Sequence, residues 1–400
     1  MADTAPIKRI AVMGGAGHVG LPLGLALAKV GFEVTLYDTN DAALDVIQGG
    51  RVPFQEEGAE ELLRRLLPTG HLLFRSDADC VHGVDALISV IGTPVDEHLN
   101  PKLTTFMRAM ETILEHLGDG QLLILRSTVS PGTCARLHDW IQRSGKHVHL
   151  AFCPERIIEG KALEEIPKLP QIVSGFTPEA VAGARYIFEK LGPEIIELPP
   201  EEAELSKLFV NVWRYLKFAV ANQFYMIANE FGLDFERILH SVRYNYPRGQ
   251  DLPQPGFAAG PCLFKDTMQL AAAYHAGFQL GHAAMLVNEG LPDYLVRRLA
   301  VRYPLRNMTV GILGMSFKAD SDDVRESLSF KLRKLLLMQG ATVLCSDPHV
   351  PDPSFISPEA LVEQTDLIIV GTPHRVFRSL DTREKPLVDI WNLFGRGRMV

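Results

Sequence analysis

The sequence predicts an α/β fold with a doubly wound sheet at the N-terminus, a central all-helical region with one long helix, and a smaller α/β domain at the C-terminus. Short apolar runs alternate with helical stretches over residues 7–198 and again after residue 304, as in parallel sheets with crossover helices. Between them, residues 201–230 contain neither proline nor glycine and carry apolar residues at helical spacing, which predicts the long helix. We therefore expect domains at residues 1–198, 199–303 and 304–400.

The individual elements follow from the same patterns in chain order. In the N-terminal domain, apolar runs predict strands at residues 7–12, 33–37, 86–91, 122–125, 148–152 and 172–174, and helical periodicity predicts helices at 21–30, 104–117 and 135–143. Pro199 and Pro200 end this domain and precede the long helix. In the C-terminal domain, the same signals predict strands at 309–313, 342–345, 367–370 and 387–390, with a helix at 330–338.

The overall composition argues against several classes of protein. The 400 residues are 46% apolar and 22% charged, as in an ordinary globular protein, and the net charge of −8 argues against nucleic acid or an anionic membrane as the main partner. Five cysteines are scattered without CxxC spacing, which is typical of free thiols in a reducing compartment. The segment Met1–Pro6 has no basic-then-apolar signal, and no apolar run approaches the length of a membrane span. We therefore expect a cytoplasmic protein.

A glycine-rich turn near the N-terminus predicts a dinucleotide site. The sequence GAGHVG follows the first predicted strand and opens the first predicted helix, which is the context that a GxGxxG motif requires. Its glycines let the backbone approach a pyrophosphate at the helix N-terminus. The cofactor contacts are therefore expected at Gly15, Gly17, His18, Val19 and Gly20.

Side chains at three further strand ends are expected to contribute to the same site. Asp38 ends the second predicted strand, where a carboxylate bonds a ribose 2′-hydroxyl and repels a 2′-phosphate, so the sequence favours NAD over NADP. Thr93 and Thr128 lie just past two other strands, at the edge where open parallel sheets bind their ligands. Without the fingerprint, these threonines would be read as ordinary loop residues.

A cysteine between turn residues and a charged pair gives the second chemical signal. Cys262 follows Gly-Pro and precedes Asp266 by four residues, while Lys207 and Asn211 share one face of the long helix. A nicotinamide cofactor together with a nucleophilic thiol would oxidise an aldehyde through a thioester, with Lys207 stabilising the oxyanion and Asp266 assisting proton transfer. The alternatives stay open at this point, because a lone cysteine is often a small buried hydrophobe and Lys207 with Asn211 often a solvated face.

Several motifs together give the chain a resemblance to a known family over almost its whole length. They are the GxGxxG turn continuing as Leu21-Pro22-Leu23, Ser127-Thr128-Val129, Pro154-Glu155-Arg156, the segment 207–211, the segment 262–266, and Phe317-Lys318 with Val324-Arg325-Glu326-Ser327. With these motifs the chain resembles the UDP-glucose/GDP-mannose dehydrogenase family of nucleotide-sugar 6-dehydrogenases. The branch it resembles most is that of the UDP-N-acetyl-D-mannosamine dehydrogenases.

The resemblance implies a role for each matched residue. The catalytic residues that it implies are Cys262, Lys207, Asn211, Asp266, Thr128 and Glu159. The residues that it adds to the predicted NAD site are Lys265 and Arg325. The substrate contacts that it implies are Glu155, Arg156, Lys207, Asn211, Arg214, Arg248, Gly256, Phe257 and Lys318, with Arg248 reaching the substrate across a dimer. It implies no metal ligand, and the histidines at 147 and 149 alternate on a strand without further ligands.

The resemblance also implies an architecture and a reaction. It implies a Rossmann-like NAD-binding domain, a central region that forms a homodimer through the long helix, and a Rossmann-like UDP-binding domain. The implied reaction is oxidation of a UDP-sugar by two NAD and water to a UDP-uronate, a precursor for polysaccharides. UDP-N-acetyl-D-mannosamine is the first candidate substrate, and Arg156 and Arg214 stand where donors to an acetamido group are expected. The alternatives are UDP-glucose, a two-electron hydroxy-acid dehydrogenase, and a silent nucleotide-sugar binder.

Two residues of the C-terminal domain have two interpretations. Asp347 and His374 each follow a predicted strand. Since ligands bind at the carboxyl ends of parallel strands, both residues could line a uridine pocket. Alternatively, they belong to simple turns.

Overall fold

The structure is a computed structural model that describes residues 7–93, 96, 102–258, 260–274, 277–397 and 400. Outside these ranges lie residues 1–6, where no targeting signal is expected, and Ala259, in the expected substrate loop. The chain forms two compact units, residues 1–209 and 210–400, and each is described by itself. The division into three domains at residues 198 and 303 stays a prediction.

The first unit is built on an eight-stranded sheet with the order β3-β2-β1-β4-β5-β6-β7-β8. Its strands are β1 Arg9–Met13, β2 Glu33–Tyr37, β3 Leu72–Arg75, β4 Ala86–Ser89, β5 Leu122–Leu125, β6 His149–Phe152, β7 Gln171–Gly175 and β8 Ile195–Glu197. The order of the first six strands is that of a Rossmann fold, which confirms the predicted fold class. The sheet is not parallel throughout, because β6 and β7 pair antiparallel.

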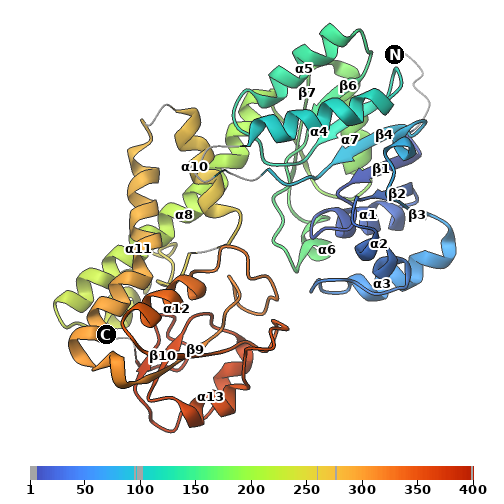
Figure 1. The fold of residues 1–400 in the computed structure, drawn as a ribbon. Coiled ribbons are helices and arrows are strands. Elements are labelled where there is room, and N and C mark those ends of the chain that lie inside the picture. Colours follow the sequence, from blue (N-terminus) through green and yellow to red (C-terminus); the bar gives the residue numbers. More distant parts are fainter. Residues whose placement is uncertain (1–6, 94–95, 97–101, 259, 275–276, 398–399) are drawn as a thin grey trace. The chain divides into compact units, whose positions relative to one another are not determined.

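Helices cover both faces of this sheet (Figure 1). They are α1 Gly20–Lys29, α2 Asp41–Gln48, α3 Ala59–Leu66, α4 Leu103–His116, α5 Thr133–Ser144, α6 Ala162–Glu165 and α7 Pro178–Glu189, with short 3₁₀ turns η1 Leu67–Thr69 and η2 Ala78–Val81. Side chains of α1, α3 and α7 pack with Ile10 and Val12 of β1, whereas those of α4 and α5 pack with Ala11. Because successive side chains of a strand point to opposite faces, the apolar run of β1 fills both layers of the core.

The predicted long helix is α8, Pro200–Glu230, which begins in the first unit and continues into the second. Pro200 stands at its first position, where the missing N–H costs no hydrogen bond. Glu201 and Glu202 follow in the first turn, where the helix dipole favours negative charge.

The second unit combines helices with a four-stranded parallel sheet of order β10-β9-β11-β12. The strands are β9 Thr309–Leu313, β10 Thr342–Ser346, β11 Leu367–Val370 and β12 Leu387–Val388. The helices are α9 Phe235–Arg243, α10 Leu263–Ala273, α11 Gln279–Arg302, α12 Leu328–Met338 and α13 Pro358–Gln364, with η3 Leu305–Asn307 and η4 Arg375–Ser379. Residues of α12 share one core cluster with β9, and those of α13 share another with β11, so the two helices cover opposite faces (Figure 1).

None of the helices in the described ranges is long and apolar enough to cross a membrane.

Candidate active site

Cys262 stands at the start of α10 in the second unit. All five cysteines lie in the described part of the chain, and Cys262 alone is exposed. It is the N-cap residue of α10, and its carbonyl accepts the first helical hydrogen bond from the Asp266 amide at 2.9 Å. The positive end of a helix dipole favours negative charge, and the thiolate is the nucleophilic form of cysteine. Position and exposure therefore suit Cys262 to attack an electrophile.

One turn further along α10, Asp266 lies fully buried. Its Oδ2 accepts a hydrogen bond of 2.6 Å from Nδ2 of Asn211, which is itself 4% exposed. Its Oδ1 lies 3.4 Å from Nζ of Lys265. A buried carboxylate is costly unless donors and cations compensate it, so these partners explain how Asp266 is tolerated. The structure thus places Asn211, Lys265 and Asp266 in one network one helical turn from Cys262.

The segment before Cys262 packs against the loop that carries Phe317 and Lys318. Gly260 has φ +102°, and a Cβ there would lie 2.5 Å from the Phe317 ring, so this contact requires glycine. Nζ of Lys318 lies 5.4 Å from the centre of the same ring. Further along this loop, the guanidinium of Arg325 forms an ion pair of 2.5 Å with Asp323.

A buried amide network fixes the expected substrate loop. Asn222 of α8 pairs with the backbone of Gly256 twice, accepting from its N–H at 2.8 Å and donating to its carbonyl at 3.0 Å. The same amide donates to Asn288 of α11 at 2.9 Å. The neighbouring Phe257 is buried. The loop that carries Gly256 and Phe257 is therefore tied to two helices of its own unit.

In the first unit, the glycine-rich turn has the shape of a dinucleotide cradle. The amides of Gly14 and Gly15 both donate to the Tyr37 carbonyl at 2.9 Å, which holds the turn against the end of β2. A Cβ on Gly20 would lie 2.0 Å from the Gly14 carbonyl oxygen, so the turn and α1 approach too closely for a side chain. Asp38 accepts a hydrogen bond of 3.0 Å from the Ala16 amide, which brings its carboxylate to the rim of the turn. These residues fit NAD.

Four further predicted cofactor residues lie at the same edge of the sheet or beside the turn, whereas Lys265 and Arg325 belong to the second unit. Thr93 and Thr128, which follow β4 and β5, are joined by a hydrogen bond of 2.5 Å from Thr93 Oγ1 to the Thr128 carbonyl. His18 stacks on Phe54 with ring centres 4.1 Å apart, and Val19 is the N-cap of α1.

The Pro154-Glu155-Arg156 segment is bonded mainly within its own unit. Glu155 forms a largely buried ion pair with Arg126, and its other oxygen accepts from the backbone amides of Arg156 and Ile157. Burial alone would raise the pKa of Glu155, but the charge of Arg126 lowers it below its usual range. The Arg156 guanidinium donates to the Pro170 carbonyl. A substrate contact by either side chain would have to compete with these bonds.

Four other predicted residues are placed in three different environments. Lys207 is 9% exposed and belongs to the first unit, whereas Arg214 is exposed and belongs to the second. Arg248 is also exposed, and its Nε donates to the Tyr246 hydroxyl at 2.9 Å. Glu159 is half-buried in the first unit. These roles stay predictions.

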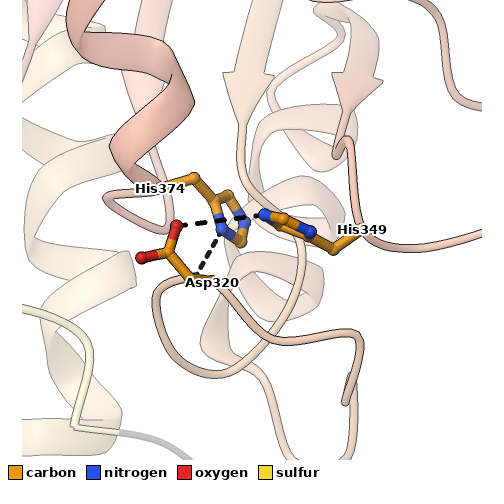
Figure 2. Close-up of side chains that lie close together, drawn as sticks. All are labelled: Asp320, His349 and His374. Atoms are coloured by element: carbon orange, nitrogen blue, oxygen red, sulfur yellow. Dashed lines mark hydrogen bonds and ion pairs between the residues drawn. The ribbon is translucent and has the colours of Figure 1, made fainter. Parts of the chain in front are cut away.

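A cluster in the segments that follow β9, β10 and β11 offers three possible metal ligands, from Asp320, His349 and His374 (Figure 2). Both ring nitrogens of His374 are already bonded within the fold. Its Nδ1 accepts from the Asp320 amide at 2.9 Å, and its Nε2 lies 3.0 Å from a carboxylate oxygen of Asp347. The Asp320 carboxylate also accepts from Arg375 at 2.6 Å. The cluster is therefore better described as a framework for the turns than as a metal centre.

Asp347 is the central acceptor of this framework. Burial alone would raise its pKa, but the hydrogen bond and charge of His374 and the backbone amides of Met315 and His349 lower it to about 2. Since Asp347 and His374 are both buried and bonded within their unit, the structure favours the turn interpretation over a direct contact with a nucleotide.

Family models match three consecutive parts of the chain. Residues 8–192 match the NAD binding domain of the UDP-glucose/GDP-mannose dehydrogenase family, residues 201–290 its central domain and residues 311–396 its UDP binding domain.

The chain belongs to the UDP-glucose/GDP-mannose dehydrogenase family.

Curated relatives and solved structures of this family resemble the chain over most of its length. An NDP-N-acetyl-D-galactosaminuronic acid dehydrogenase of Ralstonia nicotianae is 29% identical, covering 92% of this chain and 91% of the relative. A UDP-D-ManNAc dehydrogenase structure from Pyrococcus horikoshii has a TM-score of 0.87 at 27% identity, covering 94% and 91%. A UDP-glucose dehydrogenase structure from Pyrobaculum islandicum has the same TM-score at 30% identity, covering 97% and 95%.

Membership in this family confirms part of what the sequence predicts. The predicted family is confirmed, the chain is an NAD-dependent nucleotide-sugar dehydrogenase, and its cofactor is NAD. Sequence reasoning missed three buried polar residues that support the predicted ones, namely Arg126, Glu204 and Asn222. The sequence feature that could have identified them is a polar side chain at a position where the apolar spacing predicts a core residue.

Proposed function

We propose that this enzyme oxidises C6 of UDP-N-acetyl-D-mannosamine, or of a related UDP-N-acetylhexosamine, to the uronate in two oxidation steps. The observation that carries the proposal is the exposed Cys262 thiol at the start of α10, one turn from the buried Asp266–Asn211 pair. A dehydrogenase that stops at a carbonyl needs no nucleophile beside its substrate. A nucleophilic thiol allows oxidation to continue to the acid.

The proposed reaction proceeds through an aldehyde and a thioester on Cys262. The C6 alcohol loses a hydride and a proton to give an aldehyde. The Cys262 thiolate adds to the aldehyde carbon, and the resulting thiohemiacetal loses a second hydride to give a thioester. Water attacks this carbonyl and releases the acid and the free thiol. NAD, when bound, supplies the hydride acceptor, and each of the two oxidations uses a separate NAD molecule.

In this proposal, the other catalytic residues stabilise charge, transfer protons or position water. Lys207 places a cation where an oxyanion develops, and Asn211 donates to the same oxygen or to an ordered water. Asp266 relays a proton during attack and release. Thr128 and Glu159 position or activate the water that hydrolyses the thioester.

The binding residues divide between cofactor and substrate. The turn from Gly15 to Gly20 and Asp38 would hold the dinucleotide, with Thr93, Lys265 and Arg325 as further contacts. The sugar nucleotide would contact Glu155, Arg156, Arg214, Arg248, Gly256, Phe257 and Lys318, in addition to Lys207 and Asn211.

The choice of an N-acetylhexosamine follows from the relatives. Relatives that cover about nine-tenths of the chain are named for N-acetylated sugars, among them a UDP-N-acetyl-D-mannosamine dehydrogenase of Methanococcus maripaludis at 28% identity. UDP-glucose is the second candidate, because the UDP-glucose dehydrogenase of known structure is equally similar in fold.

We also propose that the enzyme is a cytoplasmic homodimer that joins through α8 and supplies a precursor for polysaccharides. Cys262 must stay a free thiol, which a reducing compartment favours. An exposed apolar stripe along α8, formed by Trp213, Val220, Phe224 and Ile227, supports the dimer.

A panel of nucleotide sugars tests the substrate. NADH formation is followed with UDP-N-acetyl-D-mannosamine, UDP-N-acetyl-D-glucosamine, UDP-glucose, UDP-galactose and GDP-mannose. We expect the highest kcat/KM with an N-acetylated sugar, UDP-N-acetyl-D-mannosamine first. It should exceed the values for the sugars without an acetamido group by roughly tenfold or more, since a site that bonds a polar substituent discriminates strongly against analogues without it. A clear preference for UDP-glucose would replace the proposed substrate by the second candidate, and no NADH with any sugar would indicate a silent binder.

A further inference from the structure

A buried carboxylate on α8 caps another helix of the first unit. Glu204 is 1% exposed. Its Oε2 accepts from the Gly132 amide at 2.6 Å, and its Oε1 accepts from the Cys134 amide at 2.8 Å. Gly132 is the N-cap of α5, has φ +82°, and has no side chain to cap the helix itself. Glu204 thus satisfies the amide of the N-cap residue and one free amide in the first turn of α5, that of Cys134, which is 70 positions away.

This cap costs more free energy of desolvation than a local one would. Burial raises the pKa of Glu204 above its usual range. A serine or aspartate at the N-cap position would satisfy the same amides at the edge of solvent. The two charge-assisted hydrogen bonds and the dipole of α5 offset the burial of Glu204. What the distant carboxylate adds is a rigid connection between α8 and the segment that precedes α5.

That segment carries Thr128, and its other end is also fixed. Ser127 Oγ donates to the Ile91 carbonyl at 2.6 Å, and Thr93 Oγ1 donates to the Thr128 carbonyl at 2.5 Å. These bonds tie the start of the segment to the loop after β4. Glu204 ties its end to α8, so residues 127–133 are held at both ends.

The same turn of α8 carries Lys207. Positions three apart lie on one side of a helix, and both Glu204 and Lys207 are buried. A rigid bond from Glu204 to Gly132 therefore sets the spacing between the turn with Lys207 and the segment with Thr128. Within the proposed function, Lys207 stabilises an oxyanion and Thr128 positions the hydrolytic water.

We propose that Glu204 is a positioning residue, which aligns Thr128 and Lys207 for the hydrolysis of the thioester by holding the start of α5 against α8. It touches neither the substrate nor NAD in this role. The proposal rests on the proposed function, because it assigns Glu204 through two residues whose roles belong to that function.

The test replaces Glu204 by glutamine, Glu204→Gln, which keeps the shape of the side chain. The new amide can still accept one of the two hydrogen bonds, but its NH₂ group faces the other backbone N–H and repels it. We expect kcat to fall roughly ten- to a hundredfold, since small misplacements of catalytic groups have effects of this size. The KM values for NAD and for the UDP-sugar should change less than about threefold, because most of the groups proposed to bind them, such as the turn from Gly15 to Gly20 and Arg248, lie outside the segment that Glu204 holds.

A second readout separates positioning from general structural damage. When the reaction is quenched and the intact protein is weighed, Glu204→Gln should show a larger fraction of the covalent thioester on Cys262 than the unchanged enzyme, because hydrolysis is the step that slows. The matched control is Glu202→Gln, an exposed glutamate in the same region of α8, which should leave kcat and the adduct fraction unchanged.

The outcomes are distinguishable. Unchanged kcat in Glu204→Gln, or a rise in KM with kcat retained and no additional adduct, overturns the positioning role. Absence of turnover in the unchanged enzyme with every sugar overturns the proposed function and this role with it. If Glu204→Gln does not fold, Glu204→Asp keeps two acceptor oxygens on a side chain one methylene shorter. It should show the same pattern with a smaller fall in kcat, and wild-type behaviour would count against the proposal.

Discussion

Among the five cysteines, the surroundings of each side chain separate a nucleophile from core residues. Burial raises the pKa of Cys80 and of Cys345 to about 11 and that of Cys153 to about 12, and Cys134 is also shifted upward by burial. These four thiols stay protonated at neutral pH. Cys262 is exposed at a helix N-terminus and so is the thiol suited to react.

Replacing this thiol tests its role. In Cys262→Ser we expect uronate formation to fall at least roughly a thousandfold, because a hydroxyl at that position is a far weaker nucleophile than a thiolate at neutral pH. NAD binding should be retained, since the dinucleotide turn lies in the other unit. Cys80→Ser is the matched control and should keep full activity. Undiminished acid formation by Cys262→Ser would contradict a thioester intermediate.

The sequence predicts the candidate catalytic residues more readily than the residues that hold them in position. Cys262 and Asp266 are four apart in one motif, so spacing alone brought them together. Arg126 reaches Glu155 across 29 positions and Glu204 reaches Gly132 across 72, and no local pattern reports such pairs. The contacts exist only once the sheet and α8 are assembled.

The part of α8 in the second unit presents an apolar stripe that the rest of this unit leaves exposed. Trp213, Val220 and Ile227 lie seven residues apart, and their exposed fractions are 54%, 44% and 45%. Phe224, 48% exposed, lies four residues after Val220, on the same side of the helix. A seven-residue repeat of apolar side chains is the pattern with which two helices pack together. We therefore assign this stripe to the proposed contact between two copies of the chain.

A charge in this stripe should separate the copies. In Phe224→Glu we expect the dimer Kd to rise roughly a hundredfold or more, because losing a central aromatic contact typically costs about 2–4 kcal/mol. Sedimentation velocity over a range of protein concentrations measures the change. Leu337→Glu is the matched control, since Leu337 of α12 is 49% exposed and lies outside the stripe. A wild-type monomer, or an unaltered dimer in Phe224→Glu, would contradict the assignment.

The direction of one strand could not be predicted from the sequence. The apolar run at residues 172–174 predicts a strand of a parallel sheet, but β7 runs antiparallel to β6. Between the two strands stands only the short helix α6, Ala162–Glu165, in place of a full crossover helix. Parallel neighbours need such a crossover, whereas apolar periodicity is identical for both directions.

The chain combines two α/β sheets, a long helix and an exposed cysteine, and it belongs to a known family. The fold could be predicted because strand and helix signals alternate strongly at both ends and α8 lacks helix breakers. Individual contacts within each unit, such as the hydrogen bond between Asn222 and Gly256, could not be predicted, because no local pattern pairs residues 34 positions apart. In the proposed function, this enzyme removes four electrons from one carbon.

The number of NADH molecules formed for each UDP-sugar consumed distinguishes a four-electron from a two-electron oxidation. With limiting UDP-N-acetyl-D-mannosamine and excess NAD, absorbance gives NADH at the end of the reaction and chromatography gives the sugar consumed and the acid formed. We expect two NADH and one UDP-uronate per sugar, because alcohol and aldehyde are oxidised in turn. One NADH per sugar with an accumulated carbonyl product would contradict it.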